Sequence, residues 1–243
     1  MLVSSPIISS WLPFDMFFSA QPINYGIVVF PGFQALDVFG PLDILNTLSM
    51  TNQLKLSIIA PTLESVSTAP LSAAMNPKNS TMHQSIVPTH TFKDPPTDLE
   101  VLIVPGGIGT RNPNITEAIQ YTKEVYPSLK YIMSVCTGAT ILARAGILDG
   151  KRATTNKRSW TWATSTGPNV TWVPVARWVE DGNIWTSSGV AAGMDSTFAF
   201  VSKIYGEDIA NTTANGIEYE RHMDAAWDPF SSIWNVPGAP PLP

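Results

Sequence analysis

Short apolar runs alternate along the chain with segments whose apolar residues recur at helical spacing. The apolar runs are rich in β-branched residues and fit strands that are covered on both faces: 25–33, 54–61, 100–107 and 130–135. Helical spacing is found in the segments between and after them: 35–50, 115–129 and 136–150. Alternating strands and helices predict an α/β fold with a mostly parallel sheet and helices on both faces.

The remaining segments add detail to this plan. Residues 62–98 are rich in Ser, Thr and Pro, and we expect short strands and loops there. Two strands within 171–189 are separated by Asp181-Gly182, which predicts a β-hairpin. Residues 192–221 are expected to be largely helical. We therefore divide the chain into three parts, namely an N-terminal extension at 1–24, one α/β domain at 25–221 and a Pro-rich C-terminal tail at 222–243.

Composition narrows the classes of partner. Charged residues make up only 14% of the chain, against about 25% in typical domains, and the net charge is −5. Basic residues form one small cluster, at Lys151, Arg152, Lys157 and Arg158. The sequence has no large cluster of basic residues of the kind that nucleic-acid binding requires. No apolar run is long enough to span a bilayer. We expect a small-molecule substrate, with neither nucleic acid nor membrane as a partner.

The compartment is left open by the sequence. Residues 1–22 are apolar, but they lack Lys and Arg and are interrupted by Asp15 and by prolines, so they make a poor signal peptide. Four N-x-S/T sequons, at Asn79, Asn114, Asn169 and Asn211, point weakly towards secretion. An intracellular location is the default expectation.

The single cysteine, Cys136, is the strongest candidate for chemistry. It follows the strand at 130–135 and begins a helical segment, so its thiol is expected at the positive end of a helix dipole with a depressed pKa. Thr137 and Gly138 are small enough to allow a sharp nucleophile elbow and the approach of a substrate. The alternative is a buried cysteine that acts only as a small hydrophobe. The three histidines lack ligand spacing, and neither a metal nor a cofactor is expected.

Two other strand ends are expected to lie near this cysteine. Asp37 follows the first strand and either acts as a general acid and base beside the thiol or serves as a helix N-cap. Gly106 and Gly107 follow the strand of the segment 100–107, which ends at Val104. Their backbone N–H groups either point into the cleft, where Gly107 polarises a developing anion, or belong to an ordinary tight turn.

Four segments together resemble the ThiJ/PfpI superfamily: FPGFQALDVFGPLDIL, VLIVPGG, SVCTGATILARAGILDGKRATTN and RWVEDGNIWTSSGVAAGMD. The resemblance covers roughly residues 25–220, and it implies a flavodoxin-like three-layer sandwich with a small hairpin addition, a homodimer and no metal. Within the superfamily the chain is most similar to the isocyanide hydratase branch. That branch pairs a nucleophilic Cys in an S-V-C-T-G context with an Asp in an L-D-x-x-G-P context, which here are Cys136 and Asp37.

The chain departs from the family pattern in three places. Many relatives carry T-T-H-W where this chain has Thr154-Thr155-Asn156-Lys157, so a histidine that assists the cysteine is missing. The extension at 1–24 is unlike compact members of the family. The Trp-rich stretch 160–185 is also unusual, and it either lines a larger pocket or packs in the core or an interface.

The resemblance implies a hydratase that converts an isocyanide to an N-formamide through a thioimidate on Cys136, with Asp37 moving the protons. Thr137 and the backbone N–H groups of the glycines are then expected to bind polar atoms of the substrate. Another cysteine-dependent enzyme, either glyoxalase-like or a natural-product tailoring enzyme, is the first alternative. A non-enzymatic redox sensor or binding protein is the second, because a reactive cysteine oxidises readily.

Overall fold

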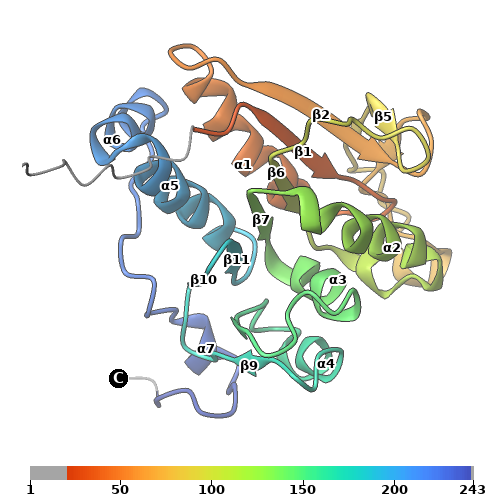
Figure 1. Cartoon of the computed structure of the whole chain (residues 1–243). Coiled ribbons are helices and arrows are strands. Elements are labelled where there is room, and N and C mark those ends of the chain that lie inside the picture. The colour runs from red at the N-terminus through yellow and green to blue at the C-terminus, as the bar shows by residue number, and fades with distance from the viewer. Residues whose placement is uncertain (1–20, 242–243) are drawn as a thin grey trace, which may run out of the picture.

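A seven-stranded sheet forms the centre of the computed structural model, which describes residues 21–241 (Figure 1). In spatial order the strands are β10 (Trp178–Asp181), β11 (Ile184–Ser187), β7 (Tyr131–Ser134), β6 (Val101–Val104), β1 (Asn24–Val28), β2 (Lys55–Ala60) and β5 (His90–Thr91). All neighbouring strands are parallel except β10 and β11, which form an antiparallel hairpin around Asp181 and Gly182. The predicted parallel sheet with a hairpin addition is confirmed.

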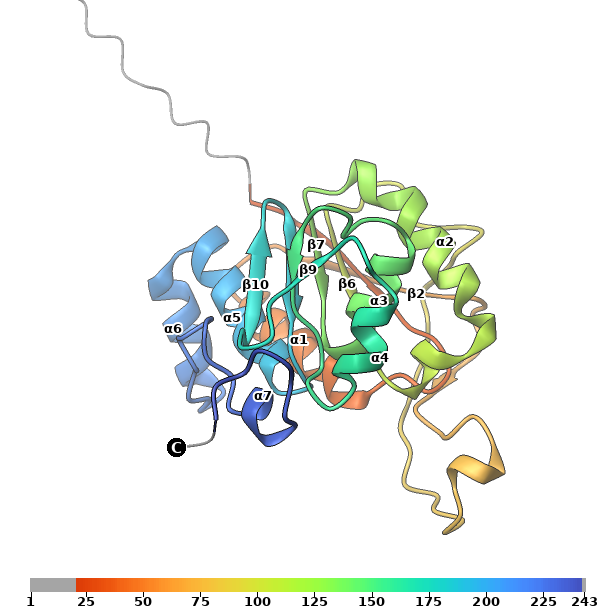
Figure 2. The same ribbon diagram turned by 90° about the horizontal axis from the view of Figure 1, so that it is seen from below.

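Helices cover both faces of this sheet. One face carries α1 (Ala35–Leu48), α5 (Ala192–Tyr205) and α6 (Glu207–Gly216), and the other carries α2 (Thr116–Val125) and α3 (Ala139–Arg144) (Figures 1 and 2). The central strands are buried on both sides, and Ile27, Leu102 and Ile132 are among the residues with no exposed surface. Because side chains alternate between the two faces, a strand covered by helices on both sides must be apolar throughout. The predicted flavodoxin-like three-layer sandwich is confirmed.

Smaller elements surround the sheet. Two short strand pairs are β3 (Val66–Ser67) with β4 (Ser85–Ile86), and β8 (Arg152–Ala153) with β9 (Thr171–Trp172). The 3-10 turns are η1 (Ala73–Met75), η2 (Ile108–Arg111), η3 (Pro113–Ile115), η4 (Tyr126–Ser128) and η5 (Cys136–Gly138). The short helices are α4 (Trp160–Ser165) and α7 (Phe230–Ile233).

Two helical segments are shorter than the sequence predicts. The segment expected at 136–150 begins as the 3-10 turn η5, and only Ala139–Arg144 is α-helical. The helical segment expected at 192–221 breaks at Gly206, where φ is +108°, and its second helix ends at Gly216. Glycine tolerates this backbone conformation without a steric penalty, so it marks the boundary between α5 and α6.

The C-terminal segment packs against the domain. Asp228, Ser231 and Val236 are buried, although the last residues are rich in proline. The predicted boundary at 222 therefore marks a change in composition, while residues 222–241 are attached to the domain by buried contacts. The extension predicted for 1–24 lies outside the described residues except for its last four positions.

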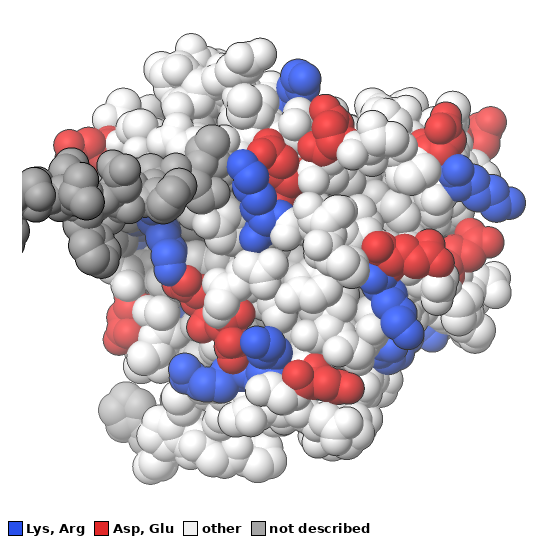
Figure 3. Space-filling view, viewed as in Figure 1, with Lys and Arg blue, Asp and Glu red and all other residues white. Residues whose placement is uncertain are grey.

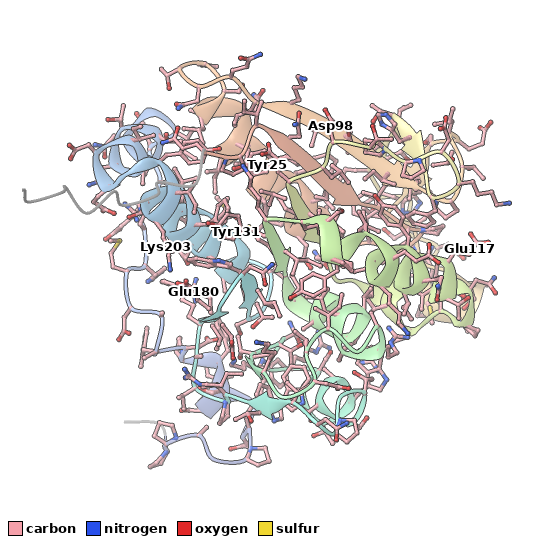
Figure 4. All side chains as sticks on the ribbon, viewed as in Figure 1. Tyr25, Asp98, Glu117, Tyr131, Glu180 and Lys203 are labelled. Atoms are coloured by element: carbon pink, nitrogen blue, oxygen red, sulfur yellow. The ribbon has the colours of Figure 1, made fainter. Side chains whose placement is uncertain are left out.

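The exposed surface mixes charges of both signs. On the face drawn in Figure 3, basic side chains lie beside acidic ones, with large uncharged areas between them. Figure 4 shows Lys203 of α5 beside Glu180 of β10, and these two residues form an ion pair. Among residues 21–241, no helix is long and apolar enough to cross a membrane.

Candidate active site

Cys136 lies on a sharp turn between β7 and α3. Its φ of +59° is in the left-handed region, which L-residues other than glycine seldom adopt. Two hydrogen bonds hold this conformation: the Cys136 N–H donates to the Ser188 carbonyl at 3.0 Å, and the Thr155 hydroxyl donates to the Cys136 carbonyl at 3.0 Å. The predicted sharp strand-to-helix turn is therefore present, and its strain is supported by neighbouring loops.

The Cys136 sulfur lies near hydrogen-bond donors but is largely buried. The backbone N–H groups of Thr137 and Val190 lie within hydrogen-bonding reach of the sulfur, and both favour the thiolate. Burial acts in the opposite direction, because only 6% of the residue is exposed. Burial and the nearby Asp37 carboxylate together raise the pKa of the Cys136 thiol above its usual range.

The expectation of a depressed thiol pKa is therefore wrong. It rested on the positive end of a helix dipole, but the turn that starts at Cys136 is a short 3-10 turn. The dipole of one short turn is small beside the cost of placing a negative charge away from water next to a carboxylate. Thiolate formation at this site must depend on moving a proton to a neighbouring base.

Asp37 is that neighbour, and it is fully buried. It is the third residue of α1, where its Oδ2 accepts the N–H of Gly106 at 2.8 Å. Burial raises the pKa of Asp37 to about 7, although the Gly106 N–H and the nearby Cys136 thiol both act to lower it. The alternative role as an N-cap is wrong, because Gln34 occupies that position and Asp37 is inside the helix. A carboxyl with a pKa near neutrality is what a proton-transfer role for Asp37 requires.

The diglycine turn after β6 supports the site from within the protein. The Gly107 N–H donates to the Thr137 hydroxyl oxygen at 3.1 Å, and the Gly106 N–H is held by Asp37. The expectation that Gly107 directs its N–H into the cleft is therefore wrong, because a protein acceptor already occupies it. The Thr110 hydroxyl also donates to the Thr137 hydroxyl at 3.1 Å, which fixes the Thr137 side chain.

Two glycines are required here by close packing. A Cβ atom at Gly106 would lie 2.5 Å from the Thr137 nitrogen and 3.0 Å from Oδ2 of Asp37. A Cβ atom at Gly138 would lie 2.2 Å from the Val104 carbonyl oxygen. Gly138 therefore has a packing role, and its N–H donates to the Val135 carbonyl. Of the proposed donors, Thr137 alone has its backbone N–H directed at the sulfur.

Sequence reasoning missed the loop that follows β11. This loop supplies Ser188, which binds the Cys136 N–H, and Val190, which approaches the sulfur. The sequence carried a signal for it: the β11 strand runs directly into Ser187-Ser188-Gly189. Since β11 lies beside β7 in a parallel arrangement, its carboxyl end must meet that of the cysteine strand.

Asn156, which stands where the resemblance implied a histidine, takes a structural role. Its side-chain oxygen accepts the Ser159 N–H at 2.9 Å and so caps the turn before α4. The neighbouring Thr155 is the residue that binds the Cys136 carbonyl. Within the described part of the chain, no group of three or more His, Cys, Asp or Glu side chains is placed to hold a metal ion.

Comparisons with known proteins agree with this arrangement. A family model described as the DJ-1/PfpI family matches residues 26–204. The chain belongs to the DJ-1/PfpI family. It is 32% identical over 200 residues to isonitrile hydratase from Pseudomonas putida, which covers 81% of this chain and 78% of that protein.

Other proteins similar to this chain include a transcriptional regulator. A THiJ/PfpI family protein from Pseudomonas syringae has a similar structure, with a TM-score of 0.67, 27% identity and coverage of 90% of this chain and 83% of that one. The HTH-type transcriptional regulator GbdR from Pseudomonas aeruginosa is 27% identical over 123 residues, which is 51% of this chain and 33% of the regulator. The family name alone therefore does not define a reaction.

Proposed function

We propose that this protein is a cysteine-dependent hydratase that converts an isocyanide to an N-formamide. The observation that carries the proposal is the pairing of Cys136 with a buried Asp37 whose pKa is raised to about 7. A carboxyl with this pKa can both give and take a proton near neutral pH. The similarity to isonitrile hydratase from Pseudomonas putida supports the same chemistry.

In the first half of the reaction, Asp37 takes the proton of the Cys136 thiol. The thiolate attacks the terminal carbon of R–N≡C and forms a C–S bond. Asp37 returns the proton to the same carbon, which yields a thioimidate, R–N=CH–S–Cys136. The N–H groups of Thr137 and Val190 stabilise the negative charge while it resides on sulfur.

In the second half, the Asp37 carboxylate takes a proton from water as the water oxygen adds to the thioimidate carbon. Asp37 passes this proton to the nitrogen, and the resulting tetrahedral intermediate collapses with expulsion of the Cys136 thiolate. The hydroxyl proton then passes through the Asp37 carboxylate to the thiolate, which releases R–NH–CHO and restores the Cys136 thiol. The sum of the two halves is one isocyanide plus one water, so Asp37 ends in its starting protonation state and no cofactor is consumed.

Burial of the nucleophile favours this substrate class over the alternatives. Only 6% of Cys136 is exposed, so the reacting end of a substrate must be narrow. An isocyanide presents a single terminal carbon on a linear group, whereas glyoxals bring a substituted carbonyl to the sulfur. A redox sensor requires an exposed thiol of low pKa, and Cys136 has neither property.

The decisive experiment is an assay with para-nitrophenyl isocyanide, in which formamide is followed by absorbance. We expect turnover by the wild type and none by Cys136→Ala. In Asp37→Asn we expect turnover to fall by about a hundredfold or more, because the proton carrier is gone. The matched control is Asp43→Asn, which alters an exposed carboxylate on the same helix and leaves turnover unchanged.

Mass spectrometry of the intact protein provides a second readout. A Cys136 adduct with the mass of the isocyanide is expected when the reaction is quenched during turnover. If a panel of aryl and alkyl isocyanides gives neither formamide nor adduct with folded wild-type protein, the proposal is wrong.

A further inference from the structure

A second hollow, distinct from the cysteine site, lies between α4 and the C-terminal segment. Its volume is about 260 Å³, and Cys136 and Asp37 are not among the residues that line it. Its walls come from three parts of the chain: the end of η2, the segment 157–162 and the segment 234–237. Figures 1 and 2 show α4 and α7 at the same end of the molecule. We call this hollow the Arg-Trp pocket.

Two arginines line the Arg-Trp pocket, and each lies over an indole ring. The Arg111 guanidinium is 3.6 Å from the ring centroid of Trp162, and the Arg158 guanidinium is 5.4 Å from that of Trp234. At 3.6 Å the Arg111 guanidinium stacks on the indole with its flat face, which leaves its in-plane N–H groups available, whereas Arg158 makes a more distant cation–π contact. The surrounding indoles make a planar, apolar wall beside those donors.

Neither arginine has a carboxylate partner among the described residues. The Arg111 guanidinium donates one hydrogen bond, from Nη2 to the Ser159 hydroxyl at 3.3 Å. Within the part of the chain that the structure describes, Arg158 forms no ion pair. No Asp or Glu lines the pocket. The net charge of the chain is −5. Two arginines that are 47 positions apart in the sequence, line one pocket and lack a carboxylate partner are therefore an unusual concentration of positive charge.

Lys157 is not a free donor, and burial lowers its pKa to about 7, so it adds only part of a positive charge at neutral pH. Its Nζ donates to the Thr154 hydroxyl at 2.6 Å and to the Ala176 carbonyl at 2.7 Å, and it lies 3.9 Å from Asp228. The Asp228 carboxylate is in turn occupied by the Ser188 hydroxyl and the Phe230 N–H. Asp228 is not among the residues that line the pocket, and direct contacts to a ligand fall to the two arginines.

We propose that the Arg-Trp pocket binds a small, flat organic carboxylate, with Arg111 and Arg158 holding its charge and the indole rings holding its apolar body. Arginine suits this role because its planar donors match the two oxygens of a carboxylate, and it stays charged at every physiological pH. The Arg-Trp pocket lies at the carboxyl end of the sheet, on the same side as the cysteine site. Arg111 follows Thr110, and the Thr110 hydroxyl contacts that of Thr137, the residue next to Cys136.

The test is direct binding of 2-naphthoate, measured by isothermal titration calorimetry on the full-length protein at low salt. The neutral isostere 2-naphthamide has the same rings without the charge. We expect one naphthoate per chain and binding of the amide weaker by about tenfold or more. Because the charges are accessible to water, naphthoate binding should also weaken as salt is added.

Variants locate the binding. Arg111→Gln and Arg158→Gln are each expected to weaken naphthoate binding by about tenfold, whereas Arg152→Gln, an exposed member of the same basic cluster, should leave it unchanged. Trp234→Leu reports on the apolar wall and should weaken naphthoate and naphthamide alike.

The inference is overturned if folded wild-type protein does not bind naphthoate at millimolar concentration, if the amide binds equally well, or if Arg152→Gln has the same effect as the other two arginine variants. The readout is independent of isocyanide turnover, so the hydratase proposal and this proposal can fail separately.

Discussion

The carbonyl of Ser188 accepts the N–H of Cys136 at 3.0 Å, and so a loop at the end of β11 helps hold the cysteine in its left-handed conformation. The Ser188 hydroxyl donates to Asp228, which lies near Lys157. Both charged side chains are about 1% exposed. The C-terminal segment is therefore connected through Asp228 to the loop that holds the candidate nucleophile.

This connection predicts a large effect of Lys157→Met on stability. The substitution removes the hydrogen bonds to Thr154 and Ala176. Burial lowers the pKa of Lys157 to about 7, so below that pH the substitution also leaves the buried Asp228 carboxylate without its cation. Breaking a buried pair in this way costs about 3 kcal/mol, measurable as the free energy of unfolding in urea. Lys151→Met is the control, because the Lys151–Asp181 pair is 3.6 Å apart and partly exposed, and its loss should cost less than about 1 kcal/mol. Equal effects of the two variants would contradict the role of the buried pair.

The pairing of Asp37 with Cys136 predicts the pH dependence of turnover. Below pH 7 both groups carry a proton, because the pKa of Asp37 is about 7 and that of the thiol is raised further. Above pH 7 Asp37 loses its proton, and the pair then holds the single proton from which thiolate and acid can form. We expect kcat/KM to rise by about tenfold per pH unit below 7 and to level off above it. A profile that falls as the pH rises through 7 would contradict this assignment.

The close packing around Gly106 predicts that the site does not tolerate an added methyl group there. Its added Cβ would meet the Thr137 nitrogen at 2.5 Å and Oδ2 of Asp37 at 3.0 Å. Gly106→Ala must therefore displace one or both groups, and a displacement of about 1 Å costs about a hundredfold in kcat/KM. Gly216→Ala is the matched control, because nothing lies within 4 Å of its Cβ position, and its turnover should equal that of the wild type. Circular dichroism checks that both variants are folded.

The periodicity of the sequence was sufficient to predict the sheet, the helices on both faces and the hairpin at Asp181-Gly182. It also brought Cys136 and Asp37 together, because both follow strands that end at the same edge of a parallel sheet. The pKa of Cys136 was mispredicted because burial depends on tertiary packing, which sequence spacing does not report. The direction of the Gly107 N–H was mispredicted for the same reason: its acceptor, the Thr137 hydroxyl, is 30 residues away. The buried Lys157–Asp228 contact was missed because its residues are 71 positions apart in the sequence, and the second of them lies in a segment that read as a tail.

The backbone strain at Cys136 predicts an unusual order of stability among its variants. At a φ of +59° a residue with a Cβ is strained by about 1 kcal/mol, whereas glycine is not. Cys136→Gly should therefore be more stable than Cys136→Ala, although both lose the thiol. Ala199→Gly in the middle of α5 provides the contrast, because there glycine should destabilise by about 1 kcal/mol. Urea unfolding of the three variants measures these differences. If Cys136→Gly is less stable than Cys136→Ala, the turn holds no strain, and the conformation of the nucleophile needs no support from Ser188 and Thr155.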